Sequence, residues 1–302
     1  MSMKYYSFFP HSNSCTSLQL LLVEAERAWA YSQELIAQSL VNVDNAHSLH
    51  HSATGRFRRS VNWSTRLLSL CQSLYASSRL SADSLLQVTI YTLILNGRFL
   101  RYRDEFEDAL VQLSVARHLL DELADRASTS RDQALATLFA DGIGPEIRYC
   151  AHELGRSKAY DVDNIVKELA SEHRNEIVDG YDTLIVKLKT EGEASGKSEV
   201  RKKLGSILWE DQPVPVRNPE LVDVLLKAQE AEAKLGAEKG AQGTGDKGTQ
   251  KGTGSGSKKG VAAYDAILLA LSDAEDVARK LVEAQQVCFL QTVMSFDQLS
   301  RS

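Results

Sequence analysis

The chain has 302 residues, of which 43% are hydrophobic and 25% charged, and its net charge is −5. These proportions are ordinary for a soluble protein, and five prolines among many Leu, Ala, Glu and Arg residues favour helix. An acidic net charge excludes a protein that binds nucleic acid through a basic surface covering the whole molecule. No apolar run approaches the roughly 20 residues of a membrane-spanning helix.

The first third of the chain predicts three helices. Residues 1–17 predict an irregular lead-in, and apolar residues then recur on one helical face over 18–38. Turn-forming residues over 41–55 predict a polar loop that carries His47, His50 and His51. A second helix is expected over 56–76. Ser81, followed by Asp83 and Ser84, begins the third.

The stretch 97–120 organises the prediction of the fold. Gly97 and Ala109 are small residues twelve apart, and Leu113 and Ala116 follow at four and three residues. Tetratricopeptide units space their residues in this way, because antiparallel helices nest closely only where their side chains are small. An ordinary amphipathic helical hairpin has the same spacing. Either reading predicts an all-α, tetratricopeptide-like array of antiparallel helices with one short extended segment.

The remaining elements follow in order. We expect a helix from about residue 131 to Gly142, a new helix begun by Pro145 and closed by Gly155, and two more over 161–190. A loop over 191–196 precedes the extended segment 212–217, whose alternating prolines exclude helix. A further helix is expected from Pro219 to about Leu235.

The predicted domain organisation follows from these elements. Residues 18–235 form one helical domain after the lead-in 1–17. Residues 236–260 contain glycine with Thr, Ser, Gln and Lys but no large apolar residue, which predicts a disordered linker. Residues 261–302 resume as an amphipathic helix, which we expect to be the start of a truncated second region.

No motif indicates an enzyme. The phosphate-loop motif needs four residues between its glycines, whereas three separate Gly192 from Gly196. The three histidines of 47–51 have no acidic or thiol partner at fixed spacing, and the four cysteines form no CxxC pair. We therefore expect no catalytic residue, no bound metal and no cofactor.

Basic residues gather in one part of this acidic chain. Eight arginines lie between His50 and Asp104, against two aspartates. Arg56, Arg59 and Trp63 share one helical face, where guanidinium groups can bind phosphate and the indole can stack on a base or pack inward. A solvated charged face is the alternative. The candidate RNA-binding residues are Arg56, Arg58, Arg59, Arg66, Arg98, Arg101 and Arg103. We expect Arg56, Arg58 and Arg59 to converge with Arg98 or Arg101 on one exposed surface.

Several strings resemble a known family. LLLVEAERAWAYSQEL (20–35), Arg56-Phe-Arg-Arg59, the stretch 70–73, the hairpin 97–116, EIRYCAHELG (146–155) and the Trp209–Val216 segment occur in this order. They resemble the RNA-binding domain of signal recognition particle subunit 68, over about residues 18–235. AERAW and IRYCA carry much of the likeness. Trp29 of the first string shares a helical face with Leu22 and Ala25, so we expect it to be mostly buried, with the helix of Tyr149 and Cys150 packed against it.

The resemblance implies a function. It implies a helical subunit that binds the RNA of the signal recognition particle and acts with subunit 72 and other particle proteins in co-translational targeting to the endoplasmic reticulum. The implied location is the cytoplasm, after a nuclear or nucleolar assembly stage. The family's basic helix corresponds to Arg56, Arg58 and Arg59.

Two departures from the family leave an alternative open. Residues 1–17 contain one basic residue, Lys4, where the family has an arginine-rich segment. The family is also longer, so we expect the region that binds subunit 72 to be missing. The alternative function is therefore a helical protein–protein scaffold that has lost RNA binding with the arginine-rich segment.

Overall fold

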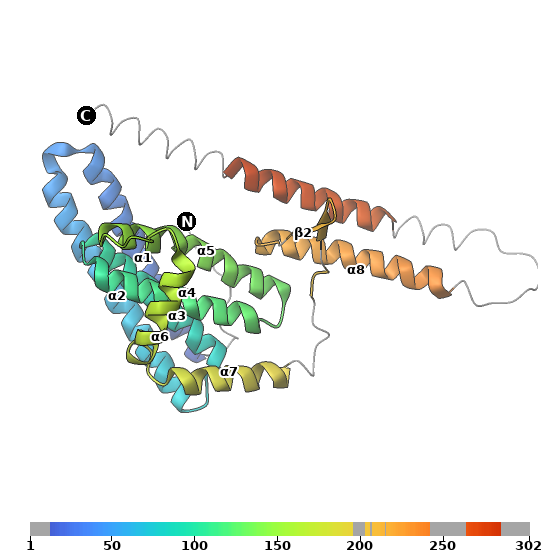
Figure 1. The fold of residues 1–302 in the computed structure, drawn as a ribbon, viewed down its shortest axis with the longest axis horizontal. Helices are drawn as coiled ribbons and strands as arrows, with labels where there is room; N and C mark the ends of the chain where they lie inside the picture. Colours follow the sequence, from blue (N-terminus) through green and yellow to red (C-terminus); the bar gives the residue numbers. More distant parts are fainter. Residues whose placement is uncertain (1–12, 196–202, 206, 215, 242–263, 285–302) are drawn as a thin grey trace, which may run out of the picture. The chain divides into compact units, whose positions relative to one another are not determined.

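The fold is an array of helices, as the sequence predicts (Figure 1). A computed structural model describes residues 13–195, 203–205, 207–214, 216–241 and 264–284. The chain separates into two compact units, the first comprising Met1–Arg126 with Phe139–Glu199 and the second comprising Ala127–Leu138 with Val200–Ser302. The helices that contribute to the first unit are α1 (Asn13–Val41), α2 (Ala46–Ala76), α3 (Ala82–Tyr102), α4 (Phe106–Arg126), α5 (Ser130–Glu153), α6 (Val162–Ile177) and α7 (Tyr181–Ser195).

α1 and α2 form a long hairpin joined by a short 3-10 turn, Val43–Asn45. Both helices begin earlier than predicted, α1 at Asn13 rather than Leu18 and α2 at Ala46 rather than Arg56. The three histidines of 47–51 therefore lie on a helix and not in a loop. Fully buried Ala53 lies in this added part of α2, so tertiary packing outweighs the turn-forming residues around it. Across the hairpin, Ser60 Oγ donates to the carbonyl of Ala25 at 2.7 Å.

α3 and α4 form the central hairpin. Ser81 caps α3 by accepting the backbone N–H of Ser84 at 3.2 Å. A Cβ added at Gly97 would lie 2.8 Å from Cγ of Leu113 on α4, closer than real Cβ atoms approach. Ala109 is fully buried. The predicted close contact between these two helices is thus confirmed, and it requires glycine at position 97.

A buried aromatic cluster joins the two hairpins. Phe57 on α2 packs against Phe99 on α3, with ring centroids 5.3 Å apart in an edge-to-face arrangement, and Leu95 completes the cluster. Trp29 on α1 packs against this cluster, but it is only partly buried. Tyr149 is 48% exposed and its ring meets Phe106, so this tyrosine does not point into the core.

α5 corrects the prediction of two separate helices. It runs without a break from Ser130 to Glu153 and holds Pro145 in its interior. Burial of Ile143 and Ile147 on one face keeps the helix continuous despite the missing proline N–H. One turn before the proline, the carbonyl of Ala140 accepts Nη1 of Arg117 at 2.6 Å. Gly155, with a φ of +67°, ends the helix as predicted.

The last helices of the first unit close it from two sides. α6 packs on α4 and α7 packs on α3. α7 extends to Ser195, through the residues predicted as a loop. Its Glu191 accepts the backbone N–H of Ala82 at 2.9 Å, which satisfies a donor at the first turn of α3.

Among its described residues, the second unit contains the first part of α5, a small hairpin and two further helices. The strands β1 (Ile207–Trp209) and β2 (Gln212–Val214) pair antiparallel, so the predicted extended segment is half of a hairpin. Glu210 and Asp211 connect them with φ values of 48° and 61°, the signs a type I′ turn requires. α8 (Pro219–Ala241) reaches into the range predicted as linker, and residues 242–260 lie outside the described part. Residues 264–284 are helical.

None of the described helices combines the length and the apolar run that crossing a bilayer requires.

Candidate functional site

The arginines of α2 lie on its outer side. The buried residues of this helix recur every three or four positions, among them Phe57, Ser60 and Leu67. This periodicity turns one face of α2 toward its neighbours and the opposite face to solvent. The exposed arginines are Arg56, Arg58, Arg59 and Arg66. Arg56, Arg59 and Trp63 fall on one side of the uninterrupted helix, as the sequence predicts, and Arg66 follows three residues later.

Two of these arginines rest on aromatic rings. The guanidinium carbon of Arg56 lies 4.8 Å from the ring centroid of Tyr31 on α1. That of Arg66 lies 5.0 Å from the ring of Trp63, one turn earlier on α2. Attraction between the cation and the ring's negative face holds each side chain in place. Arg58 and Arg59 are exposed and make no hydrogen bond or ion pair with any residue that the structure describes.

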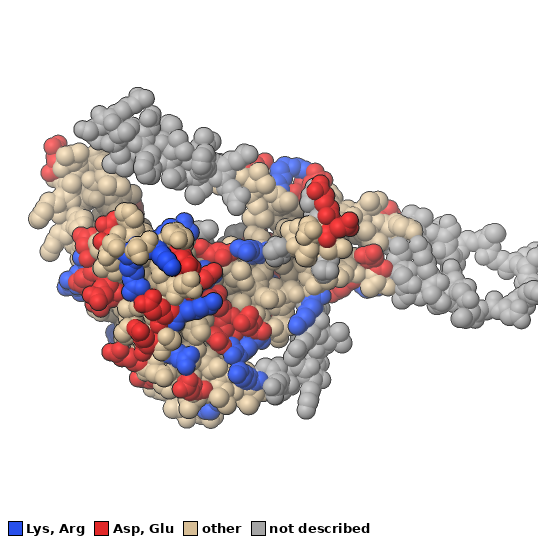
Figure 2. All heavy atoms as spheres, in the orientation of Figure 1, with Lys and Arg blue, Asp and Glu red and all other residues tan. Residues whose placement is uncertain are grey.

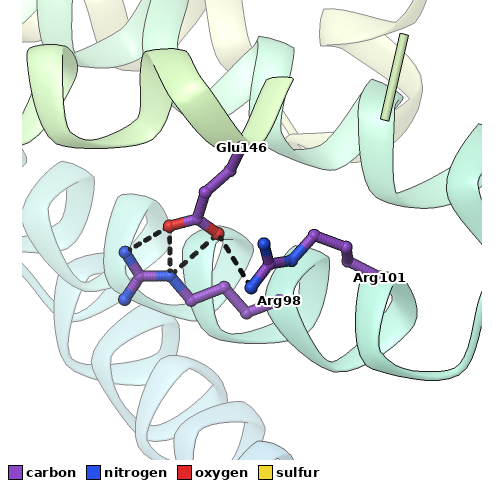
Figure 3. A network of polar contacts seen from close by, with 3 residues as sticks. All are labelled: Arg98, Arg101 and Glu146. Atoms are coloured by element: carbon purple, nitrogen blue, oxygen red, sulfur yellow. Dashed lines mark hydrogen bonds and ion pairs between the residues drawn. The ribbon is translucent and has the colours of Figure 1, made fainter. Parts of the chain in front are cut away.

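The arginines at the end of α3, and Arg103 just after it, are engaged with carboxylates. Arg98 donates from Nε and Nη2 to Oε1 of Glu146 at 2.9 and 2.7 Å, and Nε also lies 3.2 Å from Oε2 (Figure 3). Arg101 approaches Oε2 of the same carboxylate at 3.9 Å. Arg103 pairs with Glu105 at 2.8 Å. Figure 3 shows the two guanidinium groups of α3 on either side of the single acid of α5.

This pairing corrects one expectation. The sequence predicts that Arg56, Arg58 and Arg59 share one exposed surface with Arg98 or Arg101, but Arg98 and Arg101 are paired with Glu146. Arg103 is likewise paired with Glu105. Glu146 is mostly shielded, with 15% of its side chain exposed, and this strengthens its ion pair with Arg98. Of the seven candidates, the four arginines of α2 remain as exposed cations without a carboxylate partner among the described residues. The assignment of RNA contact to any of the seven stays a prediction.

One face of the first unit can be inspected for a basic patch in Figure 2. On the face shown in Figure 2, basic and acidic side chains are intermixed over the helices of the first unit. A hollow at the α5–α6 connection is lined by two arginines and three aspartates, together with Gly144, Pro145, Tyr160 and Val162. Its Arg117 is already engaged with Asp121 and with the carbonyl of Ala140. The excess of acid makes this hollow unsuitable for a phosphate.

Nothing described supports catalysis. Cys71 and Cys150 are fully buried, and burial raises the pKa of each thiol to about 11, so both stay protonated at neutral pH. Within the described ranges, no three His, Cys, Asp or Glu residues are grouped as a metal site would need.

Two residues of this region were missed in the sequence. Tyr31 lies on α1 but reaches Arg56, 25 positions away, and no local pattern indicates such a contact. Glu146 has the place of a helix-starting acid beside Pro145, yet it is the acid that binds Arg98. Only the packing of α5 against α3 could have revealed this role.

Comparison with known proteins identifies one family. The model of a family described as RNA-binding signal recognition particle 68 matches residues 11–291. The signal recognition particle subunit SRP68 of Drosophila melanogaster is 25% identical over 219 residues, which is 72% of this chain and 33% of that protein. The Dictyostelium discoideum subunit of the same name is 24% identical over 148 residues, or 48% of this chain and 22% of that protein. The aligned part thus spans a third or less of these relatives.

Proposed function

The chain belongs to the RNA-binding signal recognition particle 68 family, and from this premise we propose that it binds the RNA of the signal recognition particle through the exposed arginines of α2. One observation carries the proposal: four arginines of α2 are exposed and have no carboxylate partner among the described residues, namely Arg56, Arg58, Arg59 and Arg66. The arginines at and just after the end of α3 are instead held in ion pairs. The role is structural and non-catalytic.

The chemistry of guanidinium suits this role. A guanidinium group stays charged at any physiological pH and can donate hydrogen bonds to two phosphate oxygens at once. It is also less strongly hydrated than an ammonium group. Arg56 and Arg66 lie ten residues apart on a continuous helix, so they span about 15 Å along its axis. A rigid row of cations can therefore contact several phosphates of one RNA segment at once.

The proposal extends to the particle. The chain acts in co-translational targeting of secretory proteins to the endoplasmic reticulum, in the cytoplasm after a nuclear or nucleolar assembly stage. Its protein partners are other subunits of the particle. Pull-down with subunit 72 tests that interaction separately, and retention of subunit 72 would contradict the expectation that its binding region is missing here.

RNA binding is tested by its salt dependence. Fluorescence anisotropy with labelled signal recognition particle RNA is measured over a range of salt concentrations. The triple variant Arg56→Gln, Arg58→Gln, Arg59→Gln should lower the slope of log affinity against log salt by about 2–3, because each phosphate contact displaces counterions. The matched control removes three exposed lysines elsewhere on the first unit, Lys158, Lys167 and Lys189.

The control should keep most of the slope. Equal losses in both variants would mean that net charge alone attracts RNA and would contradict the α2 site. Absence of salt-dependent binding by the unmodified chain would favour the protein scaffold.

A further inference from the structure

Two arginines of α2, Arg56 and Arg66, differ from Arg58 and Arg59 in lying over aromatic rings. Tyr31 is 43% exposed, and the Arg56 guanidinium lies over its ring. Trp63 is partly buried, and the Arg66 guanidinium lies over its ring. In each pair the guanidinium carbon lies over a ring, while the arginine as a whole is exposed.

This arrangement has a consequence for affinity. An arginine side chain loses roughly 2 kcal/mol of rotamer entropy when it is fixed in one position. A ring beneath the guanidinium restricts the side chain before RNA arrives, so binding orders it less. The guanidinium itself is planar, and an RNA base can stack on the part of it that does not meet the ring.

Paired and unpaired RNA differ in whether their bases are free to stack on a protein side chain. In a continuous duplex each base is already stacked on its neighbours, so such a duplex offers only phosphates and 2′-hydroxyls to a protein helix. An unpaired nucleotide in a loop or bulge can turn its base onto a ring or a guanidinium. Arg58 and Arg59 lack an underlying ring in the described structure and suit phosphate, which both kinds of RNA present.

We propose that Tyr31–Arg56 and Trp63–Arg66 are two stacking platforms for unpaired nucleotides, with Arg59 between them on the phosphate backbone. The inference rests on the proposed RNA binding and adds the form of RNA that this surface selects. Tyr31 and Trp63 are positioning residues, since each acts through the arginine above it. The platforms are about 15 Å apart, roughly the length of four stacked nucleotides of one strand.

The test compares two variants of one exposed residue on two RNAs. Tyr31→Phe keeps the ring under Arg56, whereas Tyr31→Leu removes it. Both are titrated by anisotropy against a hairpin with an unpaired loop and against a fully paired duplex with the same number of phosphates. Thermal unfolding of each variant checks that the fold is retained.

The loss of affinity should depend both on removing the ring and on the form of the RNA. Tyr31→Leu should weaken binding of the loop RNA about five- to tenfold and leave the duplex within twofold, as expected from the loss of one stacking site. Tyr31→Phe should bind both RNAs like the unmodified chain. The pair Trp63→Phe and Trp63→Leu should repeat this pattern at the second platform.

Three outcomes overturn the inference. Equal affinities of Tyr31→Phe and Tyr31→Leu for the loop RNA would show that the ring does not position Arg56. Equal weakening on both RNAs would show a general electrostatic or structural effect. In both cases the proposed function would stand. If the unmodified chain bound neither RNA, the proposed function would fail together with this inference.

Discussion

The arginines of α2 and α3 are similar in the sequence but differ in their surroundings. Arg58 and Arg59 follow one another on the exposed side of a helix whose inner side is held by Phe57. Arg98 lies on the next helix, and two of its nitrogens are bound to Glu146. An acid on α5, 48 positions away, decides that difference. A cluster of arginines in a sequence therefore predicts a basic surface only when no distant carboxylate folds onto it.

The largest effect should come from the residue between the exposed arginines. Phe57→Ala should lower the free energy of unfolding by about 3–5 kcal/mol, because it removes a buried ring that packs on Phe99 and Leu95. Arg58→Ala, one residue away, should change it by less than about 0.5 kcal/mol. Urea denaturation followed by circular dichroism measures both values. A loss below 1 kcal/mol for Phe57→Ala would contradict the packing described.

The ion pair of α3 and α5 should have an intermediate effect. Arg98→Met or Glu146→Gln should each lower the free energy of unfolding by about 1–2 kcal/mol. Arg98→Met takes away the donors that bind the shielded carboxylate, and Glu146→Gln removes the negative charge and one acceptor oxygen. The double variant should lose less than the sum of the two, and the difference gives the coupling energy of the pair. Additive losses would show that Arg98 and Glu146 do not interact in solution.

The sequence predicts features that depend on neighbouring residues, and it misses those that depend on contacts between residues far apart in the chain. The all-α array and the close α3–α4 contact at Gly97 were predictable, since helical periodicity and small-residue spacing are local signals. The start of α2 and the continuation of α5 through Pro145 were not. There, burial of Ala53 and Ile147 against other helices overrides the local turn formers. Whether an arginine is left without a carboxylate partner also depends on residues far away in the sequence, as Glu146 is from Arg98.

Replacing Glu146 should make the arginines of α3 more like the unpaired arginines of α2. Glu146→Gln frees Arg98 and Arg101 from their shared carboxylate. If RNA is attracted to available guanidinium groups, RNA affinity at low salt should rise about two- to threefold and the salt slope should steepen by up to about 1.4. Glu172→Gln on α6 removes the same charge from an exposed acid and serves as the control. An equal rise in both variants would be an effect of net charge alone.

The smallest effect concerns His118, a partly buried histidine of the first unit that is influenced by the charge of Arg174. His118 on α4 lies 3.0 Å through Nε2 from the hydroxyl of Tyr181, and Arg174 stands over the same tyrosine ring at 5.0 Å. Burial, and then the positive charge of Arg174, lower the pKa of His118 below its ordinary 6.5.

The sign of the resulting pH dependence follows from this lowered pKa. Between the folded pKa and 6.5 the unfolded chain binds more protons at His118 than the folded chain does. The free energy of unfolding should therefore fall as pH drops below about 6.5, and the decline should level off below the folded pKa. His118→Gln keeps a polar partner for Tyr181 without a titrating group, so its unfolding free energy should be flatter over the same range. Urea denaturation of both proteins between pH 5 and pH 7.5 measures the difference. Parallel curves would mean that His118 is protonated as easily in the fold as in water, which the neighbouring Arg174 and the burial of the ring oppose.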